Sequence, residues 1–341
     1  MISEAKRIVG LYRGQSITAA VIAASFVGPV AAGAEPRPDP STIITGQHEN
    51  DLLAGTDRNY TSGVRFGVTL PTGDLPSFTS DFGHWLWGEG QQRLAFDLTQ
   101  NMFTPRITQA VRPNPRDRPY AAILLGTVSL VQDTDSTRNM LSLGLGTIGP
   151  PALGEVVQND VHRTVHAATA KGWDYQLPGQ PVVQITADRI WRLPIAPPGS
   201  PLEVDTLPEL TAGLGSWRIY AQAGAQLRIG QGLDSDFGAA RIRPALTGGD
   251  AFNATRPFAW YIFAGADGQA VAWDETLNGD PFTNSRHVSR VPLVGEFQAG
   301  LVVMVANSVR VSFTHIWQTH EFYGQYGHMF QFSSAALSVK F

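Results

Sequence analysis

Hydrophobic and polar residues alternate along most of the chain. Between Trp217 and Arg228 every second residue is apolar, and the stretch from Ser334 to Phe341 repeats the pattern. A period of two over about ten residues is typical of a β-strand with one buried face. Twelve strands are therefore predicted, at residues 43–50, 63–70, 92–102, 120–132, 139–148, 181–193, 204–214, 217–228, 259–272, 292–305, 308–317 and 333–341.

A soluble sandwich or barrel would show the same alternation, so other features must identify the solvent. The polar positions hold Gly, Ser, Thr, Gln and Arg, which suit a wet lumen better than a soluble surface. The last strand ends at Phe341, which resembles the recognition signal of bacterial outer-membrane barrels. Aromatic residues gather near strand ends, where interface girdles belong: Tyr60, Trp217, Trp260, Trp317, Phe322 and Tyr323.

Hydrocarbon supplies no partners for backbone polar groups, and only a closed sheet has no unpaired edge. We therefore predict an all-β fold, a twelve-stranded antiparallel transmembrane β-barrel in the bacterial outer membrane. A short helical insertion is expected in an extracellular segment.

Composition narrows the function classes. The 341 residues include 16% charged residues, 35 glycines and no cysteine, and the formal net charge is −4. The hydrophobic fraction of 43% excludes disorder. The absence of cysteine excludes disulfides, thiolate zinc sites and a Cys nucleophile. The mildly acidic balance offers no electrostatic case for binding nucleic acid.

The N-terminus has the layout of a secretory signal peptide. Basic residues precede an apolar stretch from Ile17 to Val30, and Ala32-Gly33-Ala34 provides the small residues that a signal peptidase reads. We predict a signal peptide over residues 1–34 and a single barrel domain over residues 35–341. A transmembrane anchor is the alternative, but the apolar run is shorter than the ~20 residues that a helix needs.

If the N-terminus starts in the periplasm, the connections after odd-numbered strands face the exterior. The first three of these, at about 51–62, 103–119 and 149–180, contain most of the candidate chemistry. The connections at 71–91 and 229–258 are longer than periplasmic turns usually are. Either the strand assignment is wrong there, or these connections contain insertions.

The first exterior segment is dense in side-chain oxygens. Asn50, Asp51 and Thr61 lie in a strand–loop–strand corner that suits a hard cation such as calcium. The parity of Thr61 with Arg65 predicts that Thr61 points into the lumen. Asn50 and Asp51 can reach one ion only if the strand ends or bulges there. The alternative is a polar turn with Asn and Asp in their usual roles.

Prolines restrict the backbone of the second segment, which contains three arginines. Arg112, Arg116 and Arg118 could grip a phosphate, and the alternative is a surface turn at Asp117–Arg118.

In the third segment the hydrophobic period changes from two to about four. Val157, Val161 and Val165 form one face and Gln158, His162 and His166 another, which predicts a short amphipathic helix with the preceding proline pair in its first turn. A solvated helix face is one interpretation, and a zinc pair at His162 and His166 lacks a third ligand. The remaining role for His162 is a general base.

Five blocks occur in an order that resembles the lipid A 3′-O-deacylase (LpxR-type) family of Gram-negative outer-membrane barrels. They are His48-Glu49-Asn50-Asp51, Asp57 to Gly63, Asp117-Arg118-Pro119-Tyr120-Ala121, Ile148-Gly149-Pro150 through Gln158 to His162, and Gly172-Trp173-Asp174-Tyr175-Gln176. The resemblance implies a twelve-stranded, calcium-dependent hydrolase that removes the 3′-linked acyloxyacyl chain of lipid A.

Carried over by position, the resemblance implies that Asn50, Asp51 and Thr61 belong to the Ca²⁺-dependent centre and that His162 is the general base. Gln158, one turn before His162, is expected to orient the water or the imidazole. The sequence departs from the family at Ala168, where the family has a carboxylate, and in lacking a Lys–Arg pair for lipid phosphate. The expected partners are lipid A (lipopolysaccharide) and the outer membrane, and a monomer is expected. The alternatives are a passive pore and an outer-membrane lipase or phospholipase acting on another lipid, for which no Ser lies at an inward strand position beside a His. A nucleophilic Ser is the competing mechanism, and Ser62 is the nearest candidate, although its parity points it at lipid.

Overall fold

The computed structural model describes residues 36–242 and 251–341, so the predicted signal peptide at 1–34 lies outside the described residues. Every predicted strand is present, with ends shifted by four residues at most. The strands are β1 (Ile43–Asn50), β2 (Asn59–Thr69), β3 (Gln91–Thr104), β4 (Ala121–Asp133), β5 (Thr137–Ile148), β6 (Gln180–Trp191), β7 (Leu193–Ala196), β8 (Glu203–Gly215), β9 (Arg218–Gln231), β10 (Phe258–Asp274), β11 (Leu293–Val305), β12 (Val309–Gln318) and β13 (Phe330–Lys340).

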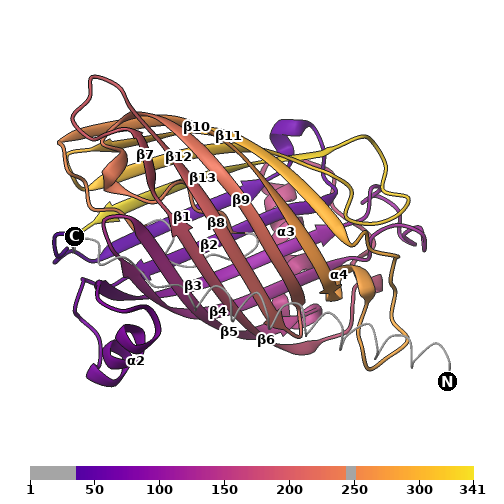
Figure 1. Cartoon of the computed structure of the whole chain (residues 1–341). Coiled ribbons are helices and arrows are strands. Elements are labelled where there is room, and N and C mark those ends of the chain that lie inside the picture. Colours follow the sequence, from indigo (N-terminus) through magenta and orange to yellow (C-terminus); the bar gives the residue numbers. More distant parts are fainter. Residues whose placement is uncertain (1–35, 243–250) are drawn as a thin grey trace.

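The sheet closes into an antiparallel barrel (Figure 1). Strand β1 pairs with β13, and β6 pairs with β8. Among the described strands, β7 is a short extra strand that pairs only with β8. The remaining twelve form the wall, which confirms the predicted fold class and strand number.

The wall has two faces of opposite polarity. On β2, Arg65 is buried in the lumen, whereas Phe66 beside it is 65% exposed on the outside. The alternation follows from the pleat, which sends successive side chains to opposite faces. None of the helices in the described part of the chain is long and apolar enough to cross a membrane.

The two ends of the barrel differ in their connections. One end has tight turns at 134–136 and 306–308, which is typical of the periplasmic end of an outer-membrane barrel. The chain ends there at Phe341, near helix α2 (Ser77–Trp87), while α4 (Glu275–Asn278) lies at the opposite end (Figure 1). The other short helices are η1 (Leu52–Ala54), η2 (Pro150–Ala152), α3 (Gly154–Thr164), η3 (Trp173–Tyr175) and η4 (Leu233–Ser235).

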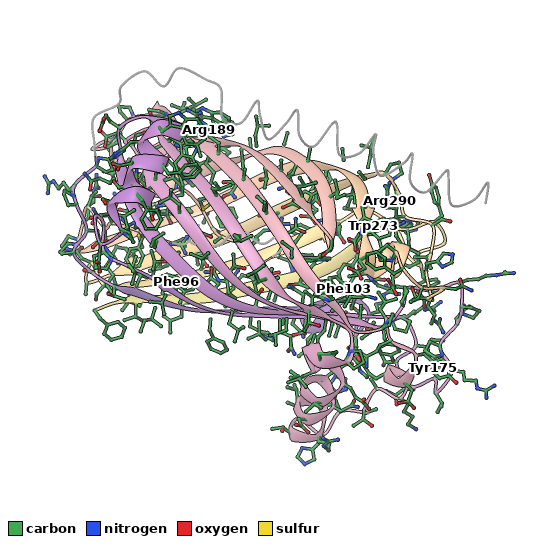
Figure 2. The ribbon with its side chains drawn as sticks, turned by 90° about the horizontal axis from the view of Figure 1, so that it is seen from below. Phe96, Phe103, Tyr175, Arg189, Trp273 and Arg290 are labelled. Carbon is green, nitrogen blue, oxygen red and sulfur yellow. The ribbon has the colours of Figure 1, made fainter. Side chains whose placement is uncertain are left out.

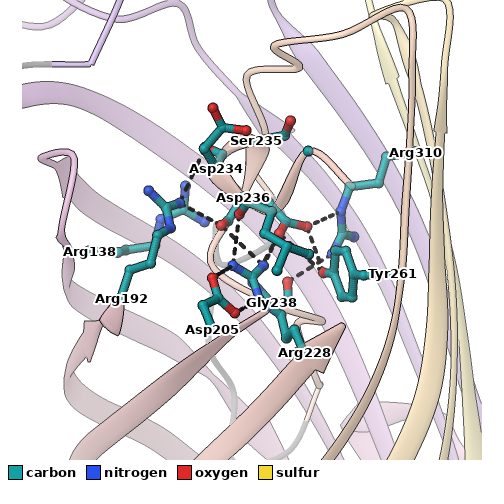
Figure 3. Close-up of polar contacts among 12 residues, drawn as sticks. Arg138, Arg192, Asp205, Arg228, Asp234, Ser235, Asp236, Gly238, Tyr261 and Arg310 are labelled. Atoms are coloured by element: carbon teal, nitrogen blue, oxygen red, sulfur yellow. Dashed lines mark hydrogen bonds and ion pairs between the residues drawn. The ribbon is translucent and has the colours of Figure 1, made fainter. Parts of the chain in front are cut away.

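The two long periplasmic connections are insertions, so the strand assignment was right. The first contains α2. The second returns into the barrel, and we call its residues 232–242 the lumen segment. Asp236 of this segment accepts hydrogen bonds from Arg228 Nη1 on β9 (2.6 Å) and Arg310 Nε on β12 (2.8 Å), as Figure 3 shows.

Further contacts fasten the lumen segment around the wall. Arg241 pairs with Glu296 on β11. The backbone N–H of Ile242 donates to Glu49 on β1 (2.9 Å), and Gln47 donates to the carbonyl of Ala240 (2.9 Å). The segment therefore bridges strands on several sides of the lumen.

Candidate functional site

The third exterior segment packs against the outside of the barrel wall. Met102 and Ala122 form a buried cluster with Ala152 and Trp173 from this segment. Gln100, on the same outer face of β3, donates to the carbonyl of Ala152 (2.6 Å). Figure 2 shows the third exterior segment, with the labelled Tyr175, outside the wall at the end of the barrel where Phe103 lies.

Helix α3 is confirmed, and its two predicted faces differ in burial from what an apolar and a polar face would suggest. Gln158 and Asn159 are buried, whereas Val161 is 53% exposed. Of the valine face, Val157 packs against the buried cluster at the wall, whereas Val165 is exposed like Val161. The proline pair lies in the separate turn η2, and His166 lies beyond the helix end with a φ of +56°.

Gln158 and His162 converge on Asp57. The Gln158 Nε2 donates to Asp57 Oδ1 (2.9 Å), while Trp173 Nε1 donates to Gln158 Oε1 (2.8 Å). The His162 Nε2 lies 3.8 Å from Asp57 Oδ2. Gln158 and His162, one helical turn apart, therefore face the same carboxylate. This agrees with the prediction that they share one face of the helix.

The hydrogen bond at Nδ1, the other ring nitrogen, determines the tautomer of His162. Its Nδ1 donates to the carbonyl of Ala168 (2.7 Å). A carbonyl can only accept, so neutral His162 carries its proton on Nδ1 and presents a lone pair at Nε2. Position 168 has no carboxylate, and its main-chain oxygen holds the imidazole.

Asn50, Asp51 and Thr61 lie together at the corner between β1 and β2. Asn50 Nδ2 donates to the carbonyl of Thr61 (2.9 Å). The Asp51 Oδ2 accepts from Thr56 Oγ1 (2.6 Å) and from the backbone N–H of Arg58 (2.9 Å). Burial, reinforced by the charge of Asp57, raises the pKa of Asp51 to about 7.

The prediction that Thr61 points into the lumen is wrong. A β-bulge between Tyr60 and Ser62 inserts Thr61 as an extra residue and breaks the alternation. The Thr61 hydroxyl lies 2.6 Å from the Thr104 hydroxyl, and Thr104 follows the outer face of β3. Thr61 therefore belongs to the outside of the wall, on the same side as α3.

Asp57 and two threonines connect the predicted residues. Thr104 Oγ1 donates to the Asp57 carbonyl (3.4 Å), and Thr108 Oγ1 donates to Asp57 Oδ2 (3.2 Å). We did not predict roles for these three residues. The sequence marks Asp57 only by its place in the oxygen-rich first segment. It does not mark the two threonines, which lie at a strand end and in a loop without a motif.

The oxygen atoms at this corner are of the kind that calcium accepts as ligands. Asp51 is a buried carboxyl, and a divalent cation would offset the burial that disfavours its charge. No group of three or more His, Cys, Asp or Glu side chains in the described ranges could hold a metal. Amide, hydroxyl and carbonyl oxygens would therefore have to complete the shell, as calcium accepts.

The three predicted arginines are not brought together. Arg112 and Arg116 are exposed, but Arg118 is fully buried and donates to Glu321 (2.7 Å) and Thr276 (2.9 Å). The predicted three-arginine grip is thus not assembled, because the buried carboxylate of Glu321 engages the third guanidinium.

A different pair of arginines meets at the extracellular rim. The guanidinium carbons of Arg106 and Arg58 lie 3.4 and 5.4 Å from the ring centroid of Tyr326. The aromatic ring holds both cations near the corner that contains Asp57.

The carboxyl of Glu275 in α4 predicts how the free energy of unfolding depends on pH. Burial, followed by the charges of Asp280 and Asp274, raises the pKa of Glu275 to about 8. Between pH 5 and 8 the unfolded chain releases this proton while the folded chain keeps it. We therefore expect the free energy of unfolding to fall as pH rises through this window, by on the order of 2 kcal/mol.

Urea unfolding of the detergent-solubilised barrel at pH 5 and pH 8 would measure this fall. Glu275→Gln should flatten the profile, whereas Glu89→Gln, at an exposed glutamate, should leave it unchanged. Equal slopes for wild type and Glu275→Gln would contradict the assignment.

Comparisons with known proteins agree with this architecture. The LpxR structure from Salmonella typhimurium matches with a TM-score of 0.71 and 21% identity, covering 88% of this chain and 100% of that one. The β domain of the Bordetella autotransporter BrkA matches with a TM-score of 0.41 and 9% identity, covering 89% and 99%. No curated protein matches the chain. The model of the family described as "Outer membrane protein LpxR" matches residues 17–341. The chain therefore belongs to this LpxR family of bacterial outer-membrane proteins.

Proposed function

We propose that the protein is a calcium-dependent esterase that removes the 3′-linked acyloxyacyl chain of lipid A. The observation that carries the proposal is the orientation of His162. Its Nδ1–H is fixed on Ala168, and its Nε2 faces Asp57 in a polar network outside the barrel wall. At the extracellular end, that location faces the leaflet that contains lipopolysaccharide.

The reaction that fits this arrangement is general-base hydrolysis. His162 Nε2 takes a proton from water, whose oxygen then bonds to the ester carbonyl carbon. The bond from that carbon to the sugar oxygen breaks, and protonated His162 returns the proton to the departing sugar hydroxyl. Asp57 lies where it would stabilise the imidazolium, and Gln158 holds Asp57 in place.

Asn50, Asp51 and Thr61 would hold the calcium ion. When bound, calcium supplies Lewis-acid polarisation of the ester carbonyl. For the lipid phosphates we propose the exposed Arg112 and Arg116, joined by the Arg58–Arg106 pair on Tyr326. Guanidinium groups suit phosphate because they donate in a planar fork.

Two alternatives make different predictions. A passive pore needs an open lumen, and the lumen segment argues against one. A serine lipase has one supporting observation, since Ser62 Oγ lies 3.3 Å from His48 Nε2 on the outer wall. Among the described residues no carboxylate contacts His48 to orient it, so the His162 route is better supported.

Mass spectrometry of lipid A from cells with and without the protein tests the proposal. We expect loss of the 3′-linked chain only when the protein and calcium are both present. Asp51→Asn should raise the calcium needed for half-maximal activity at least about 10-fold, while Asp74→Asn at the opposite end should not change it. Deacylation that persists under chelation would contradict the calcium site, and an unchanged lipid A would favour the pore or another substrate.

A further inference from the structure

Helix α2 lies against the outside of the barrel at its periplasmic end (Figure 1). Gln92 on β3 donates through Nε2 to the Ser80 carbonyl of the helix (3.3 Å) and to Gln132 Oε1 on β4 (2.8 Å). Gln92 has the parity of Phe96, which is exposed on the outer face. The helix therefore covers the membrane-facing side of the wall, not the lumen.

This packing hides polar side chains from the membrane. Gln92 is 4% exposed and Gln132 is fully buried, although both belong to the outer face. An amide in hydrocarbon without a partner costs about 2–7 kcal/mol. The helix approaches Gln92 closely at Gly83, where an added Cβ would lie 2.8 Å from the Gln92 amide and would force that side chain to shift.

The side of α2 that turns away from the barrel is aromatic. Phe78 and Trp85 are 74% and 78% exposed, and Phe82 is 43% exposed and stacks on Trp85 with centroids 5.9 Å apart. The spacing of four and three residues places them on one stripe of the helix. Asp81, also exposed, borders this stripe, because it lies three residues after Phe78 and four before Trp85. Ser77, also exposed, lies about 100° around the helix from the stripe.

We propose that α2 is an in-plane membrane anchor whose aromatic stripe inserts at the headgroup–acyl boundary of the periplasmic phospholipid leaflet. The stripe continues the lipid-facing belt of the two strands that the helix covers, where Phe96, Leu98 and Val128 are exposed. Aromatic residues are enriched at such interfaces, and an amphipathic helix of this kind sits about 5–10 Å deep. Continuity with this belt favours lipid over a protein partner.

The chain contains no cysteine, so a single introduced cysteine reports from one position only. We would attach a nitroxide label at Phe82→Cys, Trp85→Cys and Ser77→Cys in the full-length barrel, reconstituted in phosphatidylethanolamine–phosphatidylglycerol vesicles. Phe96→Cys on the wall provides the reference for a lipid-facing site. A heat-dependent gel shift would verify that each variant is folded.

The expected result is that oxygen relaxes the labels at 82 and 85 more than a water-soluble nickel complex does, as at position 96. The label at 77 should show the reverse preference. Nickel-dominated relaxation at both 82 and 85 would overturn the proposal. Strong dipolar broadening between copies labelled at 82 would also overturn it, since it would assign the stripe to a second copy of the chain.

Discussion

His162→Ala is expected to lower lipid A deacylation by about 10²–10⁴-fold while the barrel still assembles. The loss follows from the single lone pair that the site presents at Nε2, which alanine cannot replace. The rate should be measured by mass spectrometry on purified protein in lipopolysaccharide-containing vesicles, with calcium in excess.

His166→Ala is the matched control. This histidine lies four residues away, is exposed and follows the end of α3, so its loss should leave the rate within about 2-fold of wild type. Equal activity of His162→Ala and wild type would remove His162 from the mechanism and direct attention to the His48–Ser62 pair.

Asp236→Asn is expected to destabilise the barrel by about 3–5 kcal/mol. The carboxylate is buried between Arg228 and Arg310 and also accepts from Tyr261 (2.8 Å). Removing its charge deprives two buried guanidinium groups of their shared carboxylate, although Arg228 keeps its ion pair with Asp205. The shift in the urea midpoint, followed by tryptophan fluorescence, measures the loss.

Asp234→Asn provides the comparison, because Asp234 is half-buried and its carboxylate accepts only from Thr255 in the described structure. Its midpoint should move by less than about 1 kcal/mol. If the two variants unfold alike, the ion pairs at Asp236 do not hold the lumen segment in place.

The barrel could be predicted from the sequence because its signal is local. A strand with lipid on one side and a wet lumen on the other must alternate apolar and polar residues. Each of the twelve segments therefore showed the pattern of a strand by itself. The lumen segment has no such signal. Its anchors join residues far apart in the chain, such as Ile242 and Glu49, and neither residue carries a local mark of the contact.

Site residues were predicted correctly where a motif or a regular hydrophobic period marked them. They were missed where the local backbone geometry departs from that period. Gln158 and His162 share a face because helical spacing requires it. The direction of Thr61 was wrong because one bulge residue reverses the parity. Arg118 looked like its exposed neighbours, since a sequence does not show that Glu321, 203 residues later, reaches the same guanidinium.

The position of the His162–Asp57 network outside the wall determines how a ligand can arrive. A molecule that approaches through the membrane reaches the network by diffusion in two dimensions. Its encounter rate then depends on its mole fraction in the leaflet, not on its concentration in bulk water. Diluting a lipid substrate with inert lipid should therefore slow turnover, even when the amounts of enzyme and substrate in the sample stay the same.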